Sequence, residues 1–160
     1  MKNCAGAAAV IARKAGIFGM VGGQSLDVLL TDKPVNEKEM EFIFNLKTGA
    51  LIEAAFMAGA ILAGAGKECV SQLEKAGNLV GVAFQIKDDI LDVTSTQEVL
   101  GKPVFSDEKN NKTTYVKLYG MEKAVADVEN MSEKAESIVK SIGDNEFLIE
   151  LINKLISREK

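Results

Sequence analysis

Residues 81–92 read GVAFQIKDDILD, and they set three acidic side chains into an otherwise apolar helical pattern. At about 100° per residue, Gln85, Asp88, Asp89 and Asp92 fall within an arc of about 100° on one helix face. Three carboxylates at positions i, i+1 and i+4 repel one another unless cations neutralise them. Hard oxygen ligands in this arrangement suit Mg²⁺, which binds one or two carboxylates and completes its shell with water and phosphate oxygens. A solvated acidic turn is the alternative that this segment alone leaves open.

Outside this stretch, Ala, Leu, Lys, Glu and Ile recur at helical spacing and β-branched alternation is nearly absent, so we expect an all-α protein. Asn36 and Glu39 form a capping box at the start of one helix. Gly77 and Gly81 lie inside the acidic helix, where each costs up to about 1 kcal/mol relative to Ala, which predicts a close helix contact at each glycine. The predicted helices span 1–15, 17–30, 37–64, 67–93, 114–120, 121–142 and 146–157.

Composition excludes several classes of function. The chain has 160 residues, is 47% hydrophobic and 26% charged, and carries a net charge of −4 without a basic run, so we expect one globular domain that binds no nucleic acid. It contains no histidine, which excludes histidine-based catalysis and histidine metal ligation. Two distant cysteines, Cys4 and Cys69, indicate reduced thiols and a cytoplasmic location. The longest uncharged segment, 54–66, is too short to span a bilayer.

Five blocks of sequence, taken in order, resemble the trans-isoprenyl diphosphate synthases, the farnesyl and geranylgeranyl diphosphate synthase family. Residues 84–92, FQIKDDILD, are similar to the second aspartate-rich motif of that family. The other four blocks surround it and are GMVGGQSLD at 19–27, KTGALI at 47–52, GK at 101–102, and SD through KTTY at 106–115. Any one block is weak evidence, but five in the family's order cover nearly the whole chain and are highly specific.

The resemblance implies a prenyltransferase that condenses isopentenyl diphosphate with an allylic diphosphate in isoprenoid biosynthesis, using Mg²⁺. By resemblance, Asp88 is the leading Mg²⁺ ligand, helped by Asp89 or Asp92. Electrostatic stabilisation of the departing diphosphate is the main catalytic task of such a site. The residues implied to contact the substrates are Lys47, Lys102 and Lys112 at the allylic diphosphate, Thr48 and Gln85 near its reacting end, and Gln24 and Asp27 in support of the same cleft.

Several of these residues also have simpler interpretations. Lys102 and Lys112 fall in a long polar connection, where lysine is usually an ordinary surface charge. Gln24 and Asp27 also fit a satisfied buried polar junction. Lys47 has apolar neighbours and would be partly buried without an anion, which favours a functional role.

The sequence lacks the first aspartate-rich motif and the basic cluster that precede these blocks in the family. Residues 1–160 therefore resemble only the C-terminal portion of a synthase domain, and we expect the chain to be inactive alone. A non-catalytic helical subunit, or a remnant that dimerises with a complete synthase, is the alternative. A terpene cyclase shares the metal chemistry, but the Lys-Thr and Phe-Gln blocks favour a chain-elongating synthase.

A missing first half would leave apolar groups such as Leu51 and Ile86 exposed to water. Large apolar patches favour association with partners. The Ala- and Gly-rich segment 50–64 adds a surface for close helix packing. We therefore expect a homodimer.

Overall fold

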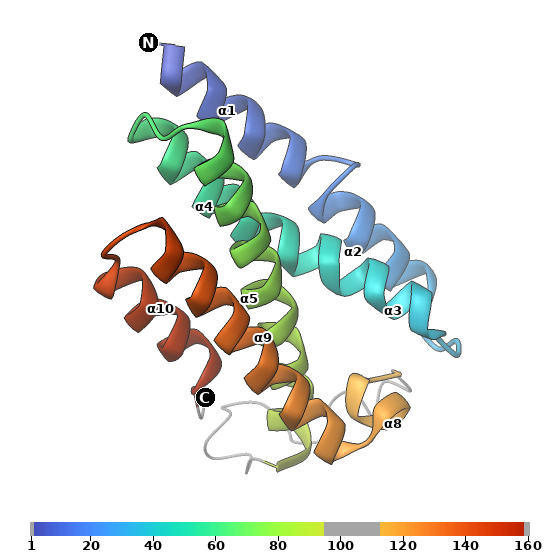
Figure 1. Ribbon diagram of the computed structural model, residues 1–160. Helices are drawn as coiled ribbons and strands as arrows, with labels where there is room; N and C mark the ends of the chain where they lie inside the picture. The colour runs from blue at the N-terminus through green and yellow to red at the C-terminus, as the bar shows by residue number, and fades with distance from the viewer. Residues whose placement is uncertain (1, 95–112, 159–160) are drawn as a thin grey trace.

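The computed structural model describes residues 2–94 and 113–158, and every regular element in those ranges is helical (Figure 1). This confirms the all-α prediction. In chain order, the elements are α1 (Lys2–Ala15), α2 (Met20–Leu29), α3 (Glu37–Phe44), the π-helical turn η1 (Asn45–Gly49), α4 (Ala50–Leu62), α5 (Lys67–Thr94), α8 (Tyr115–Tyr119), α9 (Met121–Ile142) and α10 (Glu146–Ile156).

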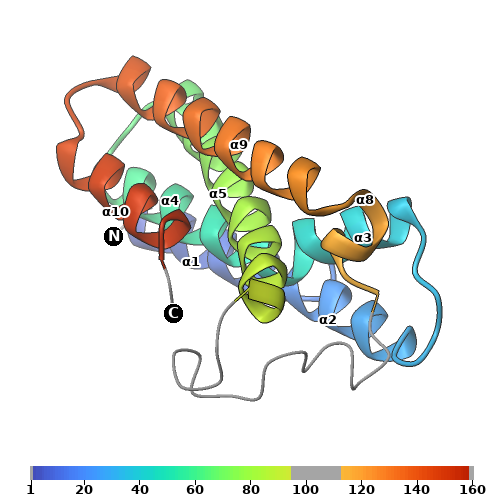
Figure 2. The same ribbon diagram turned by 90° about the horizontal axis from the view of Figure 1, so that it is seen from below.

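The long helix α5 lies at the centre of the molecule and separates two groups of helices (Figures 1 and 2). On one side, α4 packs against α5 and is covered in turn by α1. On the other side, α9 packs along α5, and α10 contacts both. The helices α2, α3 and α5 all contact η1, so the π-helical turn is enclosed by elements from three parts of the sequence.

The core follows the helical period of α5. Its buried positions recur at intervals of three and four residues, which places them along one stripe of the helix. Burying one large aliphatic side chain contributes roughly 1.5–3 kcal/mol, so the stripe fixes how α9 and α10 dock. The core residues are Ala76, Val80, Ala83, Ile86 and Ile90 of α5, Ala124, Val128, Ala135 and Val139 of α9, and Ile152 and Ile156 of α10.

Both interior glycines of α5 lie at close helix contacts, as the sequence predicts. A β-carbon on Gly77 would come within 2.8 Å of the Glu53 α-carbon, and one on Gly81 within 2.5 Å of the Gly49 α-carbon. Real β-carbons essentially never approach other atoms so closely, so only glycine lets the backbone of this region lie directly on α5.

Two local predictions concern the helical segment that begins at Glu37. The capping box is confirmed, because Glu39 N donates to Asn36 Oδ1 at 3.0 Å and Asn36 N donates to Glu39 Oε2 at 2.9 Å. The predicted helix 37–64 is found as one helical stretch, Glu37–Leu62, but a π-helical turn that the sequence did not predict lies within it at 45–49. A π-helical turn holds one extra residue and is often found at functional sites.

The expectation of exposed apolar groups holds for Leu51 but not for Ile86. The Leu51 side chain is 43% exposed, whereas Ile86 is fully buried between α5 and its neighbours. The most exposed large apolar residues lie elsewhere, at Ile17, Phe18 and Phe147, each at least 70% exposed.

Two helical stretches, Asn3–Leu29 and Glu37–Leu62, are long and apolar enough to cross a membrane by length and composition. The first is 11% buried and the second 39% buried within the structure. Core helices of soluble proteins pass the same test, so this finding is weak evidence for a span. The absence of a membrane span therefore stays a prediction.

Candidate functional site

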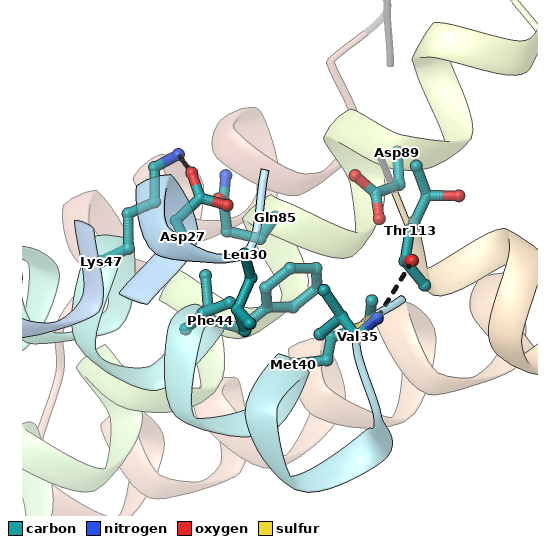
Figure 3. A pocket seen from close by; sticks show the side chains of 11 residues that line it. Asp27, Leu30, Val35, Met40, Phe44, Lys47, Gln85, Asp89 and Thr113 are labelled. Atoms are coloured by element: carbon teal, nitrogen blue, oxygen red, sulfur yellow. Dashed lines mark hydrogen bonds and ion pairs between the residues drawn. The ribbon is translucent and has the colours of Figure 1, made fainter. Parts of the chain in front are cut away.

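Lys47 and Asp27 form an ion pair that joins the π-helical turn η1 to α2. Lys47 Nζ donates to Asp27 Oδ2 at 2.6 Å, and the two side chains are only 28% and 12% exposed (Figure 3). The contact is close because Gly23 of α2 packs directly against the backbone of Leu46 and Lys47, where a β-carbon would collide. A glycine of the GMVGGQSLD block thus brings Asp27 to the lysine of the KTGALI block.

This ion pair lines a pocket whose walls are partly polar and partly apolar. Gln85 and Asp89 reach it from α5, and Thr113 and Thr114 reach it from the segment before α8 (Figure 3). Thr113 Oγ1 accepts a hydrogen bond from Val35 N at 3.3 Å, which ties this segment to the turn after α2. The apolar part of the lining is Leu30, Val35, Met40, Ile43 and Phe44. Such a lining suits a ligand with a charged head and an apolar body.

The acidic face of α5 does not form a single cluster. Asp88 Oδ1 accepts a hydrogen bond from the Arg158 guanidinium at 2.5 Å, and the Asp88 side chain remains 42% exposed. The same guanidinium lies 3.6 Å from the centre of the Phe84 ring and donates to Phe84 O at 3.2 Å. The C-terminal arginine thus neutralises the carboxylate that the sequence singles out as the leading metal ligand.

The other two carboxylates of the motif face different surroundings. Asp89 Oδ2 accepts from the backbone N–H of Tyr115 at 2.6 Å, and Asp92 is buried at 3% exposure. Within the described parts of the chain, no three Asp, Glu, Cys or His side chains lie close enough together to hold a metal ion. Their hard oxygen atoms fit Mg²⁺ chemically, and Asp88 is accessible, so the metal assignment stays a prediction.

Tyr115 anchors the segment that holds Asp89. Its hydroxyl donates to Asp127 Oδ2 at 2.6 Å, and its ring stacks on Phe44 with centroids 6.2 Å apart. Burial, followed by the hydrogen bond to Asp127, raises the pKa of Tyr115. The hydrogen bonds from Lys123 and then Tyr115 lower the pKa of Asp127, so this tyrosine remains a donor and the aspartate an acceptor at neutral pH.

The structure gathers only some of the predicted site residues. Lys47, Asp27, Gln85 and Asp89 share the pocket, whereas Gln24 and Thr48 are half-buried and are not part of its lining among the described residues. The predicted diphosphate ligands Lys102 and Lys112 lie outside the described residues.

Sequence reasoning missed Arg158 and Tyr115 as site residues. Arg158 is the third residue from the end of the sequence and belongs to none of the five blocks, so nothing local pointed to its contact with Asp88. Tyr115 belongs to the KTTY block, which did signal its position, but its backbone contact with Asp89 depends on the fold.

Comparisons with known proteins agree with the motif-based resemblance. A family model for polyprenyl synthetase matches residues 2–152. Farnesyl diphosphate synthase of Escherichia coli is 37% identical over 155 residues, which are 94% of this chain and 52% of that protein. Geranylgeranyl diphosphate synthase of Cyanophora paradoxa is 40% identical over 129 residues, which are 80% of this chain and 43% of that protein.

Solved structures show the same relationship. A geranyltransferase from Helicobacter pylori, complexed with magnesium and isoprenyl diphosphate, is 27% identical with a TM-score of 0.80, over 98% of this chain and 52% of that one. Heptaprenyl diphosphate synthase from Staphylococcus aureus is 25% identical with a TM-score of 0.86, over 96% of this chain and 60% of that one. The chain thus spans about half the length of the relatives it matches. Because the family model covers nearly all of it, the chain belongs to the polyprenyl synthetase family.

Proposed function

We propose that residues 1–160 are the C-terminal portion of a farnesyl-type polyprenyl diphosphate synthase, which condenses isopentenyl diphosphate with an allylic diphosphate. The observation that carries this proposal is the half-buried Lys47–Asp27 pair beside Gln85, at a pocket with both polar and apolar walls. The printed functions of the relatives, farnesyl and geranylgeranyl diphosphate synthases, support the same substrate class.

In this proposal, the residues of the chain act mainly by charge and position. Ionisation of the allylic diphosphate places negative charge on the departing diphosphate, and preorganised cations near that charge lower the barrier. Lys47 supplies one cation, and Asp27 holds its ammonium in place. Lys102 and Lys112 add contacts to the same diphosphate, Thr48 and Gln85 lie near the reacting carbon, and Gln24 supports the cleft.

The acidic residues of α5 would hold Mg²⁺, with Asp88 as the leading ligand and Asp89 or Asp92 as the second. When bound, the ion supplies positive charge to the departing diphosphate. The exposed Asp88 carboxylate supports the assignment, since it exchanges partners more readily than the buried Asp92. The Helicobacter pylori relative, whose structure contains magnesium and isoprenyl diphosphate, adds independent support.

We further infer a cytoplasmic homodimer. Exposed apolar side chains on α1, α2 and the turn between them favour association, and Ile17, Phe18 and Leu29 are each at least 65% exposed. Both cysteines are free thiols, which fits a reducing compartment. The relatives include bacterial proteins and chloroplast proteins of plants, so location is proposed from the chain's own composition.

The metal assignment is tested by calorimetric titration of inorganic diphosphate in the presence of Mg²⁺. Asp88→Asn should weaken binding at least about tenfold, because it removes a charged ligand. Glu68→Gln, an exposed acid on the same helix, is the matched control and should bind as the parent does. Equal affinities for both variants would remove Asp88 from the site.

Binding of Mg²⁺–diphosphate, measured together with turnover, separates the synthase portion from its alternative, a non-catalytic helical subunit. The chain alone should show no robust product formation from geranyl diphosphate, isopentenyl diphosphate and Mg²⁺, since the first metal motif is not in it. If it still binds Mg²⁺–diphosphate through Asp88, it retains half of a catalytic site. Absence of both turnover and binding would favour the non-catalytic subunit.

A further inference from the structure

The π-helical turn η1 presents Lys47, and a network of polar side chains spans it. Asn78 of α5 donates through one amide nitrogen to Asn45 Oδ1 at 2.8 Å and to Glu53 Oε1 at 2.7 Å. Asn45 is the first residue of η1. Glu53 is the fourth residue of α4, the helix that follows η1 directly. A single side chain of α5 is therefore bonded to both sides of the turn that carries Lys47.

Other side chains of this network also have hydrogen-bond partners. The Lys14 ammonium of α1 donates to Glu53 Oε2 and, at 2.7 Å, to Glu74 Oε1. Burial opposes the charge of Lys14, but its hydrogen bonds to Glu53 and Glu74 outweigh burial and raise the pKa of Lys14. Asn45 Nδ2 donates to Glu41 O at 2.8 Å. Glu53 is only 7% exposed, and a buried polar side chain needs hydrogen-bond partners such as these.

The backbone of the turn lies directly on α5 at the same place. Gly49 meets Gly81 there, and a β-carbon on Gly49 would lie 3.4 Å from Asn78 Nδ2. No side chain separates the turn from α5 at this point. The Asn78 amide is therefore close enough to hydrogen-bond both Asn45 and Glu53 directly.

The hydrogen bonds from Asn78 to Asn45 and Glu53 fix how many residues the backbone holds between these two positions. A π-helical turn holds one residue more than an α-helical turn. Reversion to a continuous α-helix would rotate the residues on one side of the turn by about 100° relative to the other side. Lys47 would then point away from Asp27, and the ion pair at the pocket would be lost.

We propose that Asn78 is a positioning residue: by bridging Asn45 and Glu53 it holds the π-helical turn in the register that directs the Lys47 ammonium at Asp27 and the pocket. The importance of this register for diphosphate binding rests on the proposed function. The register itself does not, because the geometry of the turn is independent of any ligand.

The test measures the rate at which the Lys47 amine reacts with acetic anhydride, by peptide mass spectrometry of the folded full chain. The ion pair shields this amine in the parent, and Asp27→Asn gives the rate of an unpaired Lys47. Asn78→Asp has the same shape but donates no hydrogen bond, so it should raise the rate about fivefold, towards the Asp27→Asn value. In the Asp27→Asn background the same change should add little, because no pair remains to be lost.

Two further variants separate positioning from general loss of stability. Val80→Ala removes buried volume from the same helix without touching the network, and it should leave Lys47 reactivity at the parent rate. Asn45→Ala removes the acceptor at the start of the turn, and it should raise Lys47 reactivity as Asn78→Asp does. This second variant keeps the test valid if Asn78→Asp does not fold. Parental Lys47 reactivity in both network variants, or an equal increase in Val80→Ala, would overturn the proposal.

The outcome also separates this inference from the proposed function. A raised Lys47 reactivity in Asn78→Asp, together with a parent chain that binds no Mg²⁺–diphosphate, would sustain the positioning role and refute the diphosphate site. Diphosphate binding by the parent, with Lys47 reactivity unchanged in the network variants, would have the opposite meaning.

Discussion

At the scale of single residues, Arg158 competes with any cation for the Asp88 carboxylate. The guanidinium is 20% exposed, stacked on the Phe84 ring and bonded to Asp88 Oδ1 at 2.5 Å. Its Nε is buried and has no hydrogen-bond partner among the described residues. A buried donor without a partner destabilises the contact by about 1–3 kcal/mol, which leaves the arginine easier to displace than its ion pair suggests.

Removing this arginine should therefore favour metal binding. Arg158→Ala should raise the affinity for Mg²⁺ alone by about three- to tenfold, since the cation no longer displaces a half-exposed ion pair. Isothermal titration with MgCl₂ measures the change. Lys154→Ala is the control, because Lys154 pairs with Glu150 on the exposed face of α10 and away from Asp88. An unchanged Mg²⁺ affinity in Arg158→Ala would show that Asp88 does not bind the ion.

At the scale of elements, the packing of α5 on η1 and α4 depends on two glycines. Gly81→Ala would force a β-carbon to within 2.5 Å of the Gly49 α-carbon, so it should lower the free energy of unfolding by about 1–3 kcal/mol. Gly59→Ala on α4 meets no atom within 4 Å and should stabilise the chain by up to about 1 kcal/mol through helix propensity. Urea denaturation of both variants compares them. Two changes of the same sign would contradict the close approach.

The docking of α8 onto α9 should depend on pH through Asp127. Its pKa lies below the ordinary value of 3.8 because Lys123 and then Tyr115 donate hydrogen bonds to it. A lowered pKa contributes stability that is present above the unfolded-state value and is lost as pH falls through the folded-state value. Asp127→Asn should thus destabilise the chain by about 1 kcal/mol at pH 7 and by less at pH 3.

Chemical denaturation at the two pH values measures this difference. Asp144→Asn changes an exposed aspartate near the other end of α9 and serves as the control. A destabilisation by Asp127→Asn that is equal at pH 7 and pH 3 would exclude the charge of Asp127 as its cause.

The helices and part of the site could be predicted from sequence because they depend on local signals. Helical spacing, the Asn36 capping box and the costly glycines of α5 are all local features, and the structure confirms them. The π-helical turn could not be predicted, because its extra residue is held by Asn78, thirty-three positions away from Asn45. Arg158 was missed for the same reason, since seventy positions separate it from Asp88.

At the scale of the whole molecule, the exposed apolar surface predicts self-association. Ile17 and Phe18 are 70% and 79% exposed in the turn between α1 and α2. Burying such side chains in a partner gains roughly 1.5–3 kcal/mol each, so a homodimer should form at micromolar concentration. Sedimentation velocity across a concentration series tests this. A compact monomer at every concentration would contradict the proposed dimer.

The central claim is that this half-length chain holds a diphosphate-binding site built around Lys47. Calorimetric titration with inorganic diphosphate in excess Mg²⁺ tests it most directly, with Lys33→Ala as the control at an exposed lysine. We predict saturable binding by the parent and by Lys33→Ala, and at least about tenfold weaker binding by Lys47→Ala, because a charged hydrogen bond to phosphate contributes roughly 1.5–3 kcal/mol. Absence of saturable binding by the parent, or equal affinity in Lys47→Ala, would contradict the claim.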